Sequence, residues 1–184
     1  ATAAAEDSAN VVTGEKTAIS TLQTVVDSFL PATYDSAFYL AVTRDEINEE
    51  VATAKYSVVH NDSNAFVSQS SITQSGSNEH IAVDADVSGG NVRLLATGTS
   101  VVNSVSFYRI GLGDNTTQAT TGNVTTEITA DVDSAVASID SWTLADARGA
   151  KYFISVNNAT TGELSNIEAM VVHDGSSAYI SSYN

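Results

Sequence analysis

Apolar and polar residues alternate along most of the chain with a period of two, the pattern of β-strands that bury one face. The clearest segments are short, rich in β-branched or aromatic residues and bounded by Asn, Asp, Gly or Ser; they cover residues 37–42, 54–60, 65–68 and 81–87. No segment carries a convincing apolar stripe with a helical period, although 17–26 fits a short helical turn as well as a strand. The pattern therefore predicts an all-β protein.

Polar turn sequences separate these segments at short, regular intervals. Asn61–Asn64 joins two strands, Asp174-Gly175 stands at a second hairpin, and Ser88–Asn91 turns 81–87 into a strand at 91–96. A last strand, or pair of strands, is expected within 101–112. Short antiparallel strands joined in this way indicate tandem β-sandwich domains of a jelly-roll-like kind.

The chain repeats itself at a fixed offset of 113 residues. Val26–Phe29 returns as Ile139–Trp142, and Val58-Val59-His60 returns as Val171-Val172-His173. Between 26–71 and 139–184 no gap is needed, and 12 of the 46 positions are identical. Self-similarity at one period marks duplicated structural units, so the chain is expected to hold two copies of one domain.

The repeat divides the chain into four parts. We expect a β-sandwich repeat at 21–112, a Thr- and Asn-rich linker at 113–138 with one candidate strand at 124–128, and the first half of a second repeat at 139–184. The second repeat is expected to be incomplete because it lacks the partner of residues 72–112.

Residues 1–20 form the remaining part. Asn10–Ile19 can be laid over Asn103–Leu112 at an offset of 93, with Lys16 at the position of Arg109. This overlay makes residues 1–20 a candidate closing strand of a preceding or neighbouring unit.

The charge balance is strongly acidic, with 22 Asp and Glu against 7 Lys and Arg and a net charge of −15. A surface of this sign repels phosphate backbones and anionic lipid, so neither nucleic acid nor a membrane is an expected partner. Cysteine is absent, which removes disulfide and thiolate chemistry. No apolar run is long enough to span a bilayer.

His60 and His173 occupy equivalent positions, each at the end of an apolar strand before a hairpin. A metal ligand or a pH switch is one interpretation. The favoured interpretation is a turn-packing histidine whose ring bonds a neighbouring carbonyl, because scaffold residues are what structural repeats share. His80 stands alone in a polar loop, and no zinc-binding spacing occurs.

The carboxylate groups suggest Ca²⁺ as the one candidate cofactor. Asp84-Ala85-Asp86 and Asp131-Val132-Asp133 would each place two carboxylates on one face of a strand, and Asp114-Asn115 lies near the second pair. None fits the twelve-residue calcium loop, and a solvated acidic face is the favoured interpretation. No nucleophile elbow, phosphate loop or aromatic-lined carboxylate pair is present, so we predict no catalytic, cofactor-binding or metal-binding residues and no enzyme.

Several short motifs carry a family resemblance. Ala150–Val156 followed by Glu168–Tyr179 resembles a repeated β-domain of marine T4-like cyanophage virion proteins, including fibre-type proteins. Gly89–Leu95 and Lys16–Ile19 are similar to the later part of that domain, whereas Asn61-Asp62 departs from its Asp-Gly hairpin. The resemblance implies a structural role on the outside of a tailed phage.

The expected function is therefore a non-enzymatic virion structural protein, in the tail, a fibre or another exterior component. The expected partners are other virion proteins and further copies of this chain, joined as a homo-oligomer by strand exchange in which a neighbour's residues 1–20 complete the open repeat. Two alternatives remain: a capsid decoration or collar protein, and an extracellular bacterial adhesin or surface filament subunit at the cell surface.

Overall fold

The computed structural model describes residues 11–77, 79–113, 120–121, 124–125, 132, 136–145, 147–158 and 160–183. These residues form strands and turns without a helix, which confirms the all-β prediction; 17–26 holds the end of one strand and the start of the next. Within this part of the chain no helix has the length and apolar character needed to cross a membrane. The strands are β1 (Val11–Ile19), β2 (Thr24–Phe29), β3 (Ser36–Asp45), β4 (Glu50–His60), β5 (Ala65–Gln74), β6 (Ile81–Ser88), β7 (Asn91–Gly98), β8 (Asn103–Leu112), β9 (Thr120–Thr121), β10 (Val124–Thr125), β11 (Gly149–Asn158), β12 (Glu163–His173) and β13 (Ala178–Tyr183).

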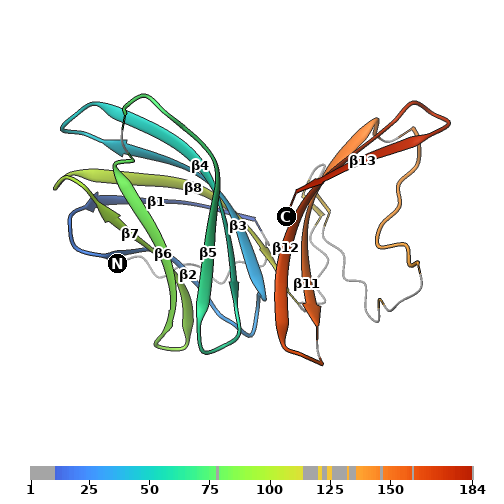
Figure 1. Cartoon of the computed structure of the whole chain (residues 1–184), viewed down its shortest axis with the longest axis horizontal. Helices are drawn as coiled ribbons and strands as arrows, with labels where there is room; N and C mark the ends of the chain where they lie inside the picture. Colours follow the sequence, from blue (N-terminus) through green and yellow to red (C-terminus); the bar gives the residue numbers. More distant parts are fainter. Residues whose placement is uncertain are drawn as a thin grey trace.

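The first eight strands form an antiparallel sandwich, as predicted (Figure 1). One sheet has the order β1-β8-β3-β4-β5, and the other has the order β2-β7-β6. β3, β4 and β5 follow one another as a meander, whereas β1 and β2 pair with strands far along the sequence, β8 and β7. Two sheets with one buried face each are what the period-two pattern requires.

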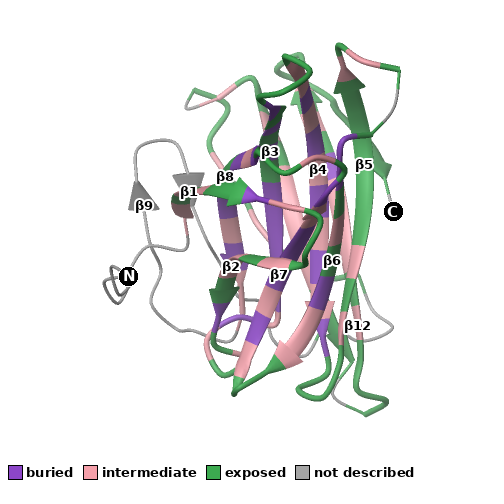
Figure 2. Ribbon diagram, turned by 90° about the vertical axis from the view of Figure 1, so that its left-hand side faces the viewer, coloured by how far each residue is buried: buried purple, intermediate pink, exposed green. Residues whose placement is uncertain are grey.

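The core lies between the two sheets, where buried residues alternate with less buried ones along β4 and β8 (Figure 2). Across the β3–β4 pair, Tyr39 pairs with Tyr56 and Ala41 pairs with Ala54. A layer of aromatic side chains therefore lies next to a layer of small ones on the inner face. From the opposite sheet, Val92 and Leu94 are almost fully buried. Alternating small and large side chains lets the two inner faces interlock without voids.

A buried ion pair joins the two sheets inside this core. The Arg109 guanidinium on β8 donates from Nη1 to Asp27 Oδ2 on β2 at 2.8 Å and to the Ser28 carbonyl at 3.3 Å. The Tyr39 hydroxyl donates to the same Asp27 oxygen at 2.9 Å. Arg109 also lies 5.6 Å from the ring centre of Phe29, within reach of a cation–π interaction.

The Asp27 carboxylate shifts the pKa values of the two groups that contact it, Arg109 and Tyr39. Burial by itself lowers the pKa of Arg109, but the Asp27 carboxylate, together with the Tyr39 and Tyr34 hydroxyl groups, outweighs burial and holds that pKa above its ordinary value. Burial, reinforced by the Asp27 carboxylate, raises the pKa of the Tyr39 hydroxyl well above its ordinary value. Arg109 is therefore a cation and Tyr39 a neutral donor, both directed at one carboxylate.

The N-terminal strand lies at the edge of the first unit's own sheet. Residues 1–20 are a candidate closing strand of a preceding or neighbouring unit, and within this chain their described part, β1, pairs with β8. Its backbone groups pair with β8 from Val11↔Ile110 to Ile19↔Asn103, which gives the β8 edge a partner. Of β1, Ile19 alone is fully buried.

The second unit contributes one three-stranded sheet, β11-β12-β13, beside the first unit (Figure 1). Between the units, β9 and β10 pair with each other in the region predicted to be a linker. Of the candidate strand at 124–128, residues 124–125 form β10, and 126–128 lie outside the described residues.

We expect the Arg109→Gln variant to unfold with a free energy about 3 kcal/mol lower than the parent chain, because it leaves the largely buried Asp27 carboxylate without its ion-pair partner. Urea denaturation followed by circular dichroism measures the change. Arg93→Gln is the matched control. Arg93 and Asp86 form an ion pair within the three-stranded sheet, but both side chains are substantially exposed, so the loss of unfolding free energy should be much smaller. Equal losses in the two variants would contradict a special role for the buried pair.

Candidate functional site

The second unit repeats the first strand for strand up to β13. β11, β12 and β13 correspond to β3, β4 and β5 at the offset of 113 residues. The registers agree as well: Tyr39 pairs with Tyr56 in the first unit, and Tyr152 pairs with Ala169 in the second. The sequence repeat is therefore a repeat of strand pairing.

Two side-chain contacts recur at the same offset. The Tyr152 hydroxyl donates to Asp140 Oδ2 at 2.7 Å, as Tyr39 does to Asp27. His60 Nε2 lies 2.7 Å from the Tyr34 carbonyl, and His173 Nε2 lies 2.7 Å from the Ala147 carbonyl. Both histidine rings thus make the backbone contact expected of turn-packing residues.

The hairpin after each of these histidines is also the same. Asn61 N–H donates to the Asn64 carbonyl, and Asp174 N–H donates to the Ser177 carbonyl. Asp62 holds a positive φ of 64° where the second unit has Gly175 at 102°. One turn earlier, Glu49 at 56° matches Gly162 at 70°. The sequence departure at Asn61-Asp62 therefore leaves the turn unchanged.

The two units differ in what covers them. In the first unit β8 pairs with β3, and the β2-β7-β6 sheet covers the inner face. In the described part of the second unit, β11 is an edge strand and Ala137–Trp142, the counterpart of β2, forms no strand. An open edge and an uncovered inner face are the features that sheets use to bind further strands.

The inner face of the second unit is only partly covered. Val58 is fully buried in the first unit, whereas its counterpart Val171 is half-buried. Ile180 is 73% exposed, although its counterpart Val67 packs against the core. Exposed apolar residues that are grouped on one face mark an interaction surface. We call this surface, formed by the inner face and the free β11 edge, the open sheet.

A cavity of about 220 Å³ lies at one corner of the open sheet. The second unit contributes one carboxylate, Asp140, and several ring or aliphatic side chains, while the end of β8 contributes Ile110 and Leu112. The second-unit residues are Asp140, Trp142, Ala147, Ala150, Lys151, Tyr152 and Phe153. Trp142 lies against Tyr152 with ring centres 6.0 Å apart, and its indole N–H donates to the Ala147 carbonyl at 3.3 Å.

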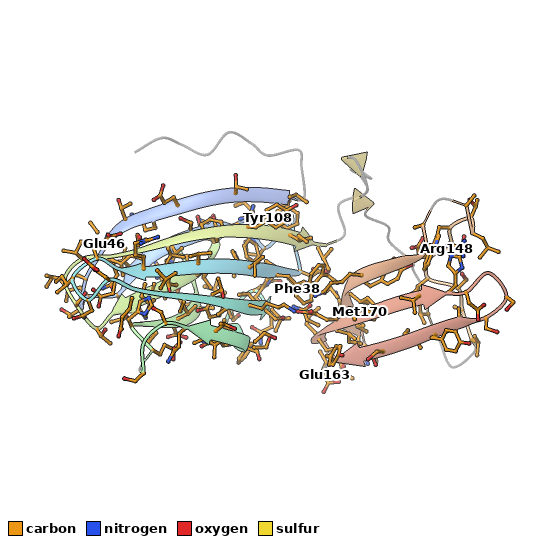
Figure 3. The ribbon with its side chains drawn as sticks, turned by 90° about the horizontal axis from the view of Figure 1, so that it is seen from above. Phe38, Glu46, Tyr108, Arg148, Glu163 and Met170 are labelled. Carbon is orange, nitrogen blue, oxygen red and sulfur yellow. The ribbon has the colours of Figure 1, made fainter. Side chains whose placement is uncertain are left out.

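The outer face of the second sheet packs on the first unit (Figure 3). Phe38 on β3 meets Phe153 on β11 with ring centres 4.8 Å apart, and Asn166 Nδ2 donates to Ser57 Oγ at 2.6 Å. Glu168 accepts ion pairs from Lys55 of the first unit at 3.1 Å and from Lys151 at 2.7 Å. Burial alone raises the pKa of Glu168, but the two lysines outweigh it and hold that pKa below its ordinary value.

The candidate calcium ligands are not gathered into a site in the described residues. Asp86 lies on β6 and forms a two-point ion pair with Arg93, with Nε 2.7 Å from Oδ1. Asp84 accepts the Ala85 N–H at 2.8 Å. Asp131, Asp133, Asp114 and Asn115 lie outside the described residues. Within 11–113 and the described parts of 120–183, no three His, Asp or Glu side chains are placed to hold a metal ion.

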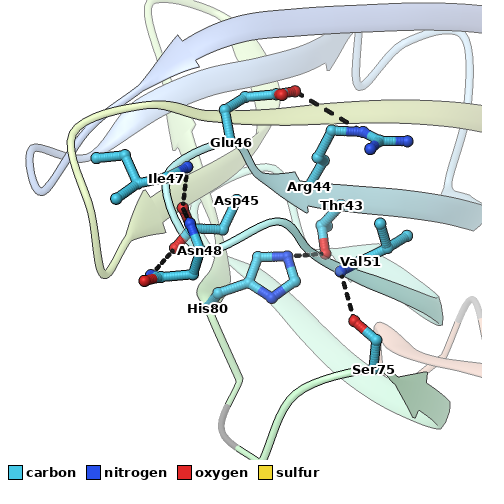
Figure 4. Close-up of polar contacts among 9 residues, drawn as sticks. All are labelled: Thr43, Arg44, Asp45, Glu46, Ile47, Asn48, Val51, Ser75 and His80. Carbon is cyan, nitrogen blue, oxygen red and sulfur yellow. Dashed lines mark hydrogen bonds and ion pairs between the residues drawn. The ribbon is translucent and has the colours of Figure 1, made fainter.

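His80 lies in the polar loop before β6, as predicted, and its side chain is buried there (Figure 4). Its Nε2 lies 2.9 Å from Thr43 Oγ1. Beside it, Asp45 accepts the Ile47 N–H at 2.9 Å and the Asn48 side-chain amide at 2.9 Å. The His80–Thr43 contact joins the segment before β6 to β3, and the Asp45 contacts close the β3–β4 turn, so we assign the cluster to the scaffold.

Comparison with known proteins adds little. No protein-family model and no curated protein matches the chain. Among solved structures it is similar to the tailspike protein of the Acinetobacter phage vB_ApiP_P1, with a TM-score of 0.39 and 10% sequence identity, over 60% of this chain and 23% of the tailspike chain. This weak structural neighbour is too distant to assign a fold or a function.

Sequence reasoning missed the open-sheet cavity and the role of Arg109. The signal was present, because Asp27 and Tyr39 both recur unchanged at the offset of 113, as Asp140 and Tyr152. What the sequence did not reveal is that β8 brings Arg109 to that pair in the first unit.

We expect acid to loosen the contact between the units. Because the pKa of Glu168 is lowered in the contact, the stabilisation is present above the ordinary glutamate pKa of about 4.3 and is lost as the pH falls through the lowered value. Small-angle X-ray scattering should show a larger radius of gyration at low pH for the parent chain. Glu168→Gln should be expanded already at neutral pH, whereas Glu163→Gln, an exposed change on the same strand, should behave like the parent.

Proposed function

We propose that this protein is a non-enzymatic structural component on the exterior of a tailed-phage virion, in the tail, a fibre or a related part. Its activity in this proposal is self-association through β-strands. The observation that carries the proposal is the open sheet: an unpaired β11 edge and an exposed apolar face whose counterparts are covered in the first unit.

The chemistry of strand addition supports this role. An added strand forms main-chain hydrogen bonds along β11 and extends the sheet, and its alternate side chains lie at the margin of the inner face. The donor surface and the acceptor surface differ, so the contact between copies is heterologous and builds rings or filaments. The net charge of −15 suits a particle surface in salt water, where screening over about 10 Å relieves the repulsion between copies.

The phage setting is supported by the sequence motifs. The hairpin sequence Val171–Tyr179 carries the resemblance to cyanophage virion domains, and it forms β12, the His173 turn and the start of β13. This motif therefore lies within the open sheet. Scaffold and proposed assembly surface are built from the same residues.

We expect electron microscopy of the purified chain at near-seawater salt to show rings, filaments or other regular oligomers. Removing residues 1–17 should abolish them, because β1 is the proposed donor strand; this variant keeps Ile19, the residue of β1 that is fully buried in the first unit. A variant lacking only residues 1–9 is the matched control and should assemble normally.

Separate small particles at every protein concentration would contradict self-assembly. Co-purification with capsids would instead favour a decoration or collar protein. Glycan binding that depends on Ca²⁺ would favour an extracellular adhesin. Unchanged assembly without residues 1–17 would show that another segment supplies the strand.

A further inference from the structure

The Arg109 position on the sandwich has a well-defined counterpart in the second unit. Arg109 lies directly opposite Tyr39 in the β3–β8 register, and its guanidinium reaches Asp27 across the core. The counterpart of that position is opposite Tyr152, on the free edge of β11. A strand added there in the β8 register would point one side chain at Asp140.

The receiving groups of the first unit are repeated in the second. Asp140 replaces Asp27, Tyr152 replaces Tyr39, and Trp142 replaces Phe29 at the offset of 113. These three residues line the 220 Å³ cavity. In the first unit the same three positions surround a cation, whereas Asp140 has no ion-pair partner among the described residues.

The chain itself contains a strand that matches β8. Asn10–Ile19 overlays Asn103–Leu112 at an offset of 93, with Asn10 on Asn103, Val12 on Val105, Lys16 on Arg109 and Ile19 on Leu112. Lys16 therefore supplies the positive charge at the Arg109 position. β1 also lies at the outer edge of its sheet, where β8 is its one paired neighbour.

We infer that the cavity beside Asp140 receives the Lys16 ammonium group of a second copy, whose residues 10–19 add to the β11 edge as β8 adds to β3. The inference rests on the proposed self-assembly and names its receiving site. Exchange replaces the β1–β8 pairing within one chain by a β1–β11 pairing between two chains, so the number of strand pairs is conserved. The Lys16–Asp140 ion pair favours the exchanged form.

Charge complementarity makes the pairing selective. The chain has 22 acidic and 7 basic residues, so a lysine at the correct position of an edge strand is a scarce partner for a carboxylate. Arginine should bind more tightly than lysine there, because its planar group can contact the carboxylate, a carbonyl and an aromatic ring together, as Arg109 does.

Trp142 allows a direct test, because it is the single tryptophan of the chain and it lines the cavity. We would titrate the full-length protein, below its assembly concentration, with a peptide of residues 103–112 and with a peptide of residues 10–19. Neither peptide contains tryptophan. Both should shift Trp142 emission to shorter wavelength, and the 103–112 peptide should bind more tightly.

Removing either charge should weaken binding by roughly tenfold or more, as expected for a partly buried ion pair. The variants are Arg109→Gln in the first peptide, Lys16→Gln in the second and Asp140→Asn in the protein. Glu163→Gln is the matched control and should leave both affinities unchanged. An unshifted Trp142 emission, or affinities that Asp140→Asn does not change, would overturn the inference.

Two further results separate this inference from the proposed function. Regular oligomers that form equally well with Asp140→Asn would overturn the receiving site and leave self-assembly standing. Binding of the 103–112 peptide but not of the 10–19 peptide would overturn the second copy as the occupant. Asp140-dependent binding of both peptides by a chain that never assembles would support the receiving site and contradict the proposed function.

Discussion

The Asp27–Arg109 ion pair is the interaction on which the first unit's architecture depends. Asp27 lies on the three-stranded sheet and Arg109 on the five-stranded sheet, so a single contact ties both layers together. Arg109 also sits on the strand that joins β1 to β3. Because Arg109 is buried and Asp27 is largely buried, the pair tolerates little variation in where β8 lies, and it thereby fixes the register of the strand that closes the sandwich.

The second unit holds only the acceptor half of that arrangement. Asp140 and Tyr152 are in place, and the strand order around them allows a closing strand at β11. Part of its outer face packs on the first unit through Phe153 and Glu168. The free β11 edge lies beside Asp140 and Tyr152, which gives an incoming strand a defined position and direction.

The fold could be predicted well from the sequence because it depends on local patterns. The alternation in residues 37–42 and 54–60 and the identical Val-Val-His triplets are visible without coordinates, and β3, β4 and β12 follow them. The pairing of β1 with β8 and the burial of His80 could not be predicted, because both depend on contacts distant in sequence. The cavity beside Asp140 could be interpreted only by comparison with the first unit, where Arg109 contacts Asp27.

The two hairpin turns of each unit show that the copies differ in the residues that adopt a positive φ. Glu49 and Asp62 adopt left-handed backbone conformations that cost an ordinary residue on the order of 1 kcal/mol each, whereas the second unit has glycine at both positions. A sandwich with a complete core can accommodate this loss of folding free energy in its turns. The three-stranded sheet buries less apolar surface, and its glycines adopt the same turns without this conformational strain.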